Sequence, residues 1–171
     1  MKEIELLEAA KHTSPNPLSL ICTRTPAGVT NLGTVSWWTY LGLEPATIGF
    51  AMMKPSYSGE MTRRNKEVVL VIPGEPLARH VMECGSTTGR DTDKAKRFGI
   101  ELMSVPGTDI EIPVHSVVAI HCGLREFVDV GDHNFYICDV KRVLADDGER
   151  ALFAWKGYAK IDEVRANFGK F

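Results

Sequence analysis

The stretch that decides the fold is Val118–Leu144, with the sequence VAIHCGLREFVDVGDHNFYICDVKRVL. Both halves alternate with the period of two that is typical of β-strands, in which apolar side chains share one face. The apolar positions are Val118, Ile120, Cys122 and Leu124 in the first half and Tyr136, Cys138, Val140 and Leu144 in the second. The segment Val130–His133 between them has the Gly and Asp residues of a hairpin connection. We therefore predict a long antiparallel hairpin.

Further strands are predicted on the N-terminal side of this hairpin. Leu18–Thr23 and Ile48–Met53 alternate in the same way, and Val68–Ile72 is a continuous apolar run, as in a strand buried on both faces. The chain contains no GxGxxG motif and no alternation of strands with helices. Many strands with few helices indicate a mainly β fold, and closure into an antiparallel barrel would remove unpaired edges.

Two short helices are predicted between the strands. Pro76–Glu83 has Pro near its first turn and Gly85 just past its end. A second helix is expected to begin after a cap at Asp91 or Thr92 and to end at Gly99.

The composition is that of an ordinary globular domain. The 171 residues are 44% hydrophobic and 25% charged, with a formal net charge of −2. We expect one domain over residues 1–171, with its core at about 17–161, and no low-complexity tract or linker divides it. Because no strongly basic field is present, nucleic acid is not expected as a partner. Basic residues recur locally at 63–66 and 90–97, which leaves a small phosphorylated ligand open.

The cysteines and the N-terminus indicate the compartment. The four cysteines form no CxxC pair, which argues against a zinc or dithiol motif and favours reduced thiols in the core. Met1–Glu8 is acidic and lacks a signal pattern, and no apolar run has membrane-spanning length. A cytoplasmic protein without a membrane partner or a metal is therefore expected.

Four segments could carry chemistry. Asn31–Trp38 offers small polar groups and two tryptophans to a planar ring, and Lys54–Ser58 offers a cation and two hydroxyls in a tight turn to a phosphate. Gly85–Lys94 is a Gly- and hydroxyl-rich loop that leads into a helix start, where anions are stabilised. In Gly131–His133, the imidazole could contact a nicotinamide or donate a proton. Taken singly, three of these segments are more typical of an ordinary turn or a surface histidine, and Gly85–Lys94 is equally typical of a capped helix.

In combination, these segments resemble the flavin-reductase-like family of FMN-binding split barrels, which includes the flavoredoxins. The resemblance runs from about Pro17 to Ile161 and depends on the order of the family's motifs. The matching residues are Asn31, Thr34, Ser36 and Trp37; Ser56 and Ser58; Cys84, Gly85, Thr88, Gly89, Arg90, Asp93 and Lys94; Gly131, Asp132 and His133; and Gly157, Tyr158 and Ala159.

The resemblance implies a six-stranded antiparallel Greek-key split β-barrel with a few short helices, a homodimer, and FMN near the subunit interface. It also implies a set of FMN-binding residues: Asn31, Thr34, Val35, Ser36, Trp37, Lys54, Ser56, Tyr57, Ser58, Gly89, Arg90 and Lys94. Tyr57 stands where the family often has a basic residue, and Lys54 could replace that contact. His133 is the candidate for the nicotinamide side.

Three functions remain open at this point. The first is an FMN-dependent oxidoreductase of the flavin-reductase type, which passes electrons from NADH, NADPH or a protein donor to an acceptor. The second is a flavoredoxin-type electron carrier without direct NAD(P)H activity. The third is a flavin-binding barrel without redox turnover.

Overall fold

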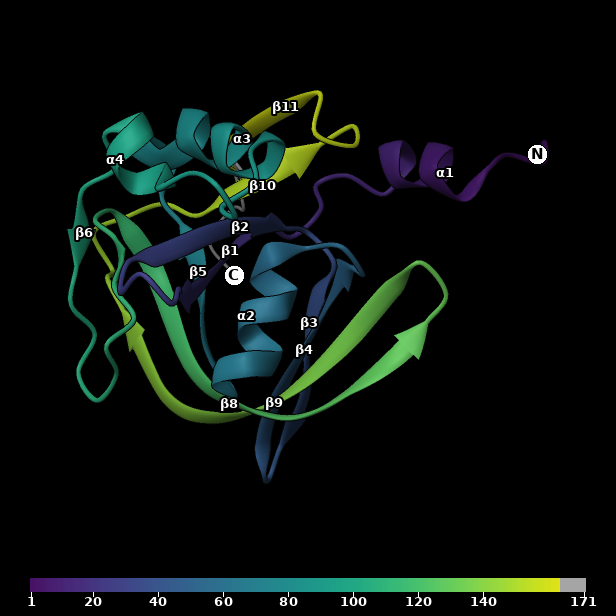
Figure 1. Ribbon diagram of the computed structural model, residues 1–171. Helices are drawn as coiled ribbons and strands as arrows, with labels where there is room; N and C mark the ends of the chain where they lie inside the picture. Colours follow the sequence, from purple (N-terminus) through teal and green to yellow (C-terminus); the bar gives the residue numbers. More distant parts are fainter. Residues whose placement is uncertain (164–171) are drawn as a thin grey trace.

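A seven-stranded antiparallel sheet forms the centre of the computed structural model, which describes residues 1–163 (Figure 1). The strand order is β2-β1-β5-β8-β9-β4-β3. These strands are β1 (Ser19–Arg24), β2 (Thr30–Val35), β3 (Trp38–Leu43), β4 (Ala46–Met53), β5 (Glu67–Pro73), β8 (Ser116–Val130) and β9 (His133–Ala145). Two small sheets pair β6 (Leu102–Met103) with β7 (Ile112–Pro113) and β10 (Leu152–Trp155) with β11 (Lys160–Glu163).

The predicted hairpin is confirmed as β8 and β9, which pair from Val118↔Ala145 to Val130↔His133. The register shifts between His121 and Cys122 and again between Leu124 and Glu126. Such bulges bend and twist a strand, and β8 and β9 curve under the other strands before their tip turns outward (Figure 1). The hairpin thereby brings its turn, with His133, to one end of the sheet.

The mainly β class is confirmed, but the central sheet has seven strands where six were expected. The segments Thr30–Val35 and Trp38–Leu43 form separate strands at opposite edges of the sheet, and Ser36 and Trp37 lie between them. Strand β2 could not be recognised from hydrophobic alternation in the sequence. Its polar Thr30 and Asn31 are buried, so apolar and polar residues do not alternate along it.

The helices are α1 (Leu6–His12), α2 (Tyr57–Asn65), a 3-10 turn η1 (Glu75–Leu77), α3 (Ala78–Ser86) and α4 (Lys94–Phe98). The predicted helix at 76–83 is confirmed as η1 and α3, although α3 passes through Gly85. The predicted cap of α4 was wrong by one or two positions, since Asp93 accepts from the Lys96 N–H, while its end at Gly99 is confirmed. Within residues 1–163, no helix is both long and apolar enough to span a membrane.

Helix α2 was not predicted, because its first residues were interpreted as a tight turn. Ser and Gly in the first turn have low helix propensity, which favours that interpretation. Ser56 instead caps the helix by accepting a hydrogen bond from the Gly59 N–H at 3.2 Å. This difference matters for the site, because the segment that was expected to form a tight turn contains the N-terminus of a helix.

Two apolar clusters form the core. One packs β1, β5 and β10 against α3 and includes Cys22 and Cys84; the other lies between β4, β8 and β9 and includes Cys122 and Cys138. All four cysteines are buried and free, as expected for small core hydrophobes. Burial raises the pKa of each thiol, to about 11 for Cys84 and about 12 for Cys138.

Candidate functional site

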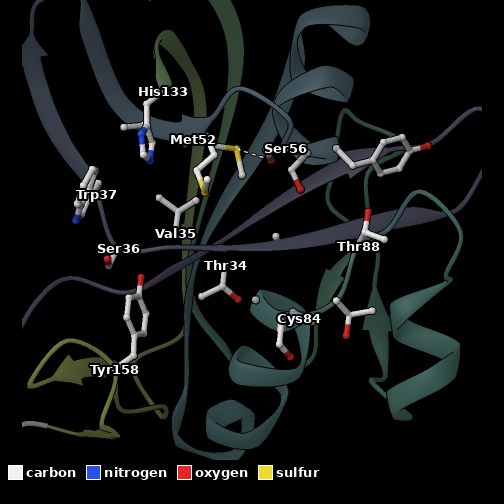
Figure 2. Close-up of a pocket in the computed structure, with 18 of the residues that line it drawn as sticks. Thr34, Val35, Ser36, Trp37, Met52, Ser56, Cys84, Thr88, His133 and Tyr158 are labelled. Atoms are coloured by element: carbon white, nitrogen blue, oxygen red, sulfur yellow. Dashed lines mark hydrogen bonds between the residues drawn. The ribbon is translucent and has the colours of Figure 1, made fainter. Parts of the chain in front are cut away.

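A pocket of about 760 Å³ lies where the end of β2, the start of α2, the loop before α4 and the start of β9 meet (Figure 2). The β10–β11 turn and α1 complete its outer wall. Figure 2 shows hydroxyl side chains, Ser56 and Thr88, at one end, and the rings of Trp37, His133 and Tyr158 at the other. We call these the hydroxyl end and the aromatic end.

Strand β2 forms the floor of the pocket and is packed tightly on its neighbours. The Thr34 hydroxyl donates to the carbonyl of Val81 on α3 at 2.6 Å, and the Asn31 amide donates to the Ser58 hydroxyl at 2.8 Å. A Cβ on Gly33 would lie 2.3 Å from Ser58 Oγ, which is closer than any real contact. Glycine at position 33 is therefore required for the first turn of α2 to approach β2.

The first turn of α2 faces the hydroxyl end. Its Ser56, Tyr57 and Ser58 all line the pocket. The N–H groups of the first helical residues, Tyr57 and Ser58, have no acceptor within a helix, and the helix dipole adds partial positive charge there. Together with two hydroxyl groups, this end of the helix is suited to hold an anion.

The loop before α4 lies against the same end. A Cβ on Gly89 would lie 1.8 Å from Asn31 Oδ1, so glycine is required here as well. That amide oxygen is buried and has no hydrogen-bond donor among residues 1–163. The site therefore contains an unsatisfied acceptor beside Gly89, which itself lines the pocket.

Lys94 brings a buried cation to the pocket. Its Nζ donates to the carbonyls of Leu32 at 2.6 Å and Cys84 at 2.7 Å, which leaves one N–H of an ammonium group for a ligand. The side chain lines the pocket, and burial lowers its pKa. A charge held in this way is costly to bury unless it meets an anion or several acceptors.

The aromatic end is built from two connections between strands and from the start of β9. The rings of Trp37 and His133 stack with their centroids 5.1 Å apart, and His133 Nδ1 lies 2.8 Å from Asp132 Oδ1. That hydrogen bond lowers the pKa of the Asp132 carboxyl. Tyr158 faces the pair across the pocket, and burial raises the pKa of its phenol (Figure 2). Planar rings favour a planar ligand at this end.

The family model of the flavin reductase like domain matches residues 11–162. The chain belongs to this family. An uncharacterised protein of Pyrococcus abyssi is 26% identical over 109 residues, which are 63% of this chain. The match covers 61% of the length of that Pyrococcus protein.

Solved structures share the fold of this flavin reductase-like chain. An FMN-binding protein from Thermus thermophilus superimposes with a TM-score of 0.83 at 18% identity, covering 99% of this chain and 98% of its own. Flavoredoxin of Desulfovibrio vulgaris has a TM-score of 0.83 at 18% identity, with 99% and 97% covered. An NADH:FAD oxidoreductase from Streptomyces globisporus has a TM-score of 0.84 at 8% identity, with 97% and 99% covered. At such identities the likeness concerns the fold, which is that of the split-barrel flavin reductases.

The structure brings together ten of the residues that the family resemblance implied. The residues that line the flavin reductase-like pocket are Thr34, Val35, Ser36, Trp37, Ser56, Tyr57, Ser58, Gly89, Lys94 and His133. Their elements are far apart in the sequence and meet through the pairing of β9 with β4 and the packing of α2 and α3 on β2.

Three implied residues do not line the pocket. Asn31 lies behind the floor and supports Ser58. The Nζ of Lys54 lies 2.7 Å from Asp129 Oδ2, and Arg90 pairs with Glu60 at 2.8 Å while its guanidinium lies over the Tyr57 ring. Both cations therefore already have carboxylate partners.

Several lining residues were not predicted as site residues. They include Gly33, Met52, Cys84, Thr87, Thr88, Tyr158 and, from α1, Leu7 and Lys11. Thr87 and Thr88 lie in a loop that the sequence had singled out, and Tyr158 lies in the Gly157–Ala159 element. Leu7 and Lys11 carry no signal in the sequence, because α1 has no buried residue.

Proposed function

We propose that this protein binds FMN in the large pocket and acts as an oxidoreductase that passes electrons from NADH, NADPH or a protein donor to an acceptor. The proposal rests on one observation: a single pocket of about 760 Å³ contains both the start of α2, which is suited to hold an anion, and the aromatic end. This volume lies in the usual range for small-molecule sites, about 300–1,000 Å³. A phosphorylated molecule with a planar ring matches both ends.

The residues present fit a phosphate at the hydroxyl end. The N–H groups of the first turn of α2, the hydroxyls of Ser56 and Ser58, and the free N–H of Lys94 would hold its oxygens.

The segment Thr34–Trp37 would hold the flavin ring, and His133 would face the electron donor. When bound, the flavin supplies the electron chemistry, and the protein binds and orients it. The imidazole of His133 is oriented by Asp132 and by the Trp37 ring. A planar nicotinamide could pack beside that pair.

The first test is the binding of FMN to the purified protein. We expect a yellow protein, or uptake of FMN at micromolar concentration, and weaker binding of riboflavin, which lacks the phosphate. A colourless protein that takes up neither flavin would instead favour a barrel without flavin function. Equal affinities for FMN and riboflavin would contradict the proposal that the hydroxyl end binds the phosphate.

The second test distinguishes the enzyme from an electron carrier. Stopped-flow mixing of the FMN-loaded protein with NADH and with NADPH should bleach the flavin absorbance if the protein is a flavin reductase. A flavoredoxin-type carrier is the second candidate, because flavoredoxin of Desulfovibrio vulgaris shares the fold over 99% of this chain. It would be reduced rapidly by dithionite or a ferredoxin but slowly or not at all by either nicotinamide.

A homodimer in the cytoplasm completes the proposal. Exposed apolar side chains on β3 and on the tip of the β8–β9 hairpin support self-association; they are Tyr40, Leu41, Leu43, Phe127, Val128 and Val130. The four free cysteines are compatible with a reducing compartment. Sedimentation should give twice the mass of the 18.9 kDa chain, and a mass near one chain would exclude the dimer.

A further inference from the structure

The turn between β10 and β11 has an unusual backbone. Three of its four residues, Lys156, Gly157 and Tyr158, have φ angles of 50°, 63° and 72°. A left-handed conformation is ordinary for glycine but uncommon for other residues and rare for a bulky side chain such as tyrosine. Strain of this kind persists only when the surrounding structure holds it, and it is concentrated at binding sites.

The surrounding structure does hold this turn. The Lys156 N–H donates to the Ser14 hydroxyl at 2.5 Å, and Asn16 and Ala154 exchange two backbone hydrogen bonds at 2.8 and 3.0 Å. A Cβ on Gly157 would be 3.4 Å from the side chain of Lys11. The turn is therefore anchored to the segment that follows α1 and keeps Tyr158 in place.

Tyr158 points from this turn into the pocket. Its ring packs on the core cluster of β1 and α3, and its hydroxyl points toward Ser36 (Figure 2). The hydroxyl and the backbone N–H of Ser36 both interact with the phenol oxygen and oppose the rise in its pKa that burial causes. The side chain thus joins the outer wall of the pocket to its floor.

Ser36 lies in the short break between two strands of the central sheet. It belongs to neither β2, which ends at Val35, nor β3, which begins at Trp38. The carbonyl of Trp37 accepts from the Ala51 N–H at 2.8 Å, so the partner strand holds the following residue. The Tyr158 hydroxyl, which points toward Ser36, gives Ser36 itself a contact outside the sheet (Figure 2).

We propose that Tyr158 is a positioning residue for the aromatic end of the pocket, which holds the Ser36–Trp37 break in the conformation that receives a flavin ring. The inference rests on the proposed binding of FMN. Tyr158 acts through Ser36, so its effect concerns the ring and not the phosphate. A variant without the phenol hydroxyl should therefore bind FMN and riboflavin less well by the same factor.

The test compares Tyr158→Phe with Tyr40→Phe, a matched change at an exposed tyrosine on β3. Affinities for FMN and riboflavin are measured by quenching of flavin fluorescence. Loss of a hydrogen-bonding contact should weaken the binding of both flavins by about fivefold in Tyr158→Phe, with their affinity ratio unchanged. Ser58→Ala shows that the method can detect a change in that ratio, because Ser58 lies at the hydroxyl end.

The double variant Ser36→Ala/Tyr158→Phe tests whether Ser36 is the intermediary. Its affinities should be higher than the product of the two single effects predicts, as for coupled residues. Affinities of Tyr158→Phe within twofold of wild type would overturn the proposal, and so would an increase, which would mean that Tyr158 competes with the ring. A changed FMN-to-riboflavin ratio would assign Tyr158 to the phosphate. Wild-type protein that binds neither flavin would refute the proposed function itself.

Discussion

The hydroxyl end and the aromatic end of the pocket are built in different ways. The hydroxyl end is formed where α2 and the loop before α4 press on β2, and glycines at 33 and 89 allow contacts that no side chain would tolerate. Its cation, Lys94, is buried and held by two carbonyls. At the aromatic end, Trp37 and Tyr158 come from connections between strands, His133 is the first residue of β9, and Trp37 is 47% exposed.

This difference suggests a division of labour within the proposed function. Regular elements with tight packing give the hydroxyl end one conformation, which is suited to anchor a phosphate. Connections between strands tolerate sequence change and carry specificity, so the aromatic end is suited to select the electron donor or acceptor. The following predictions test the two ends of the pocket, from the largest expected effect to the smallest.

The largest effect is expected from Gly89→Ala. The added Cβ would lie 1.8 Å from Asn31 Oδ1, so the loop or the strand must shift. Overpacking of this kind costs about 1–3 kcal/mol, and a shift at the phosphate seat should lower FMN affinity by about 100-fold. Calorimetric titration with FMN measures the loss. Gly148→Ala is the control, because its Cβ would meet only the Asp146 carboxylate at 3.1 Å. An equal loss in both variants would contradict a role of the Gly89 loop in holding the phosphate.

Lys94→Met should weaken FMN binding by about 10- to 100-fold, since a hydrogen bond to a charged group contributes about 1.5–3 kcal/mol. Lys54→Met, which removes a cation already paired with Asp129, should change it less than about twofold. Riboflavin affinity should change less than FMN affinity in Lys94→Met. Similar losses in the two variants would mean that the phosphate is attracted by positive charge around the pocket in general and not by Lys94 in particular.

The same lysine gives FMN affinity a pH dependence. Burial lowers the pKa of Lys94 from its ordinary value of 10.5, so the ammonium begins to lose its proton at a lower pH than a free lysine. Affinity for the phosphate should therefore fall as the pH rises through the alkaline range below 10.5, and Lys94→Met should abolish this fall. Fluorescence titrations across this range provide the measurement, and a flat wild-type profile would argue against contact between Lys94 and the phosphate.

His133→Gln addresses the aromatic end. We expect FMN affinity within about twofold of wild type, but a rate of flavin reduction by NADH or NADPH that is lower by about 5- to 10-fold, or about 1–1.4 kcal/mol. His80→Gln is the matched control, because His80 lies beside Glu83 on α3 and does not line the pocket. Stopped-flow absorbance gives the rates. An unchanged rate would separate His133 from donor recognition.

The smallest effect is expected at Cys84, which lines the pocket. Burial raises the pKa of its thiol to about 11, so alkylation by iodoacetamide should be slow at pH 7 and accelerate about tenfold per unit as the pH rises. FMN in the pocket should slow the reaction at a given pH by about threefold if it covers this thiol. Mass spectrometry of the Cys84 peptide gives both values. Rapid alkylation at pH 7 would mean that the pocket opens readily.

Prediction from the sequence succeeded where a segment carries its own signal. The β8–β9 hairpin follows from the alternation on both sides of Val130–His133. Strand β2 and helix α2 were not predicted, because the environment of the side chains in each element depends on contacts with the other element. Asn31 is polar but buried because it bonds to Ser58, and Ser58 is helical because Ser56 caps the turn.

The site shows the same limit. Ten of the thirteen residues implied by the family resemblance line one pocket, since motif order carries the arrangement of the family. Lys54 was expected to supply charge, but no local pattern reveals that the hairpin tip brings Asp129 to it. Tyr158 has no role that its own neighbours in the chain could indicate, because its partner Ser36 is more than a hundred positions away.

The sequence by itself determined the mainly β class, the long hairpin and the family, because alternation and motif order are properties of the chain that need no partner. The tertiary structure decided which donors meet in the pocket, that Lys94 and not Lys54 lies in it, and that Tyr158 faces Ser36. Those outcomes depend on the pairing and packing of strands and helices distant in sequence, which bring together groups that have no local signal.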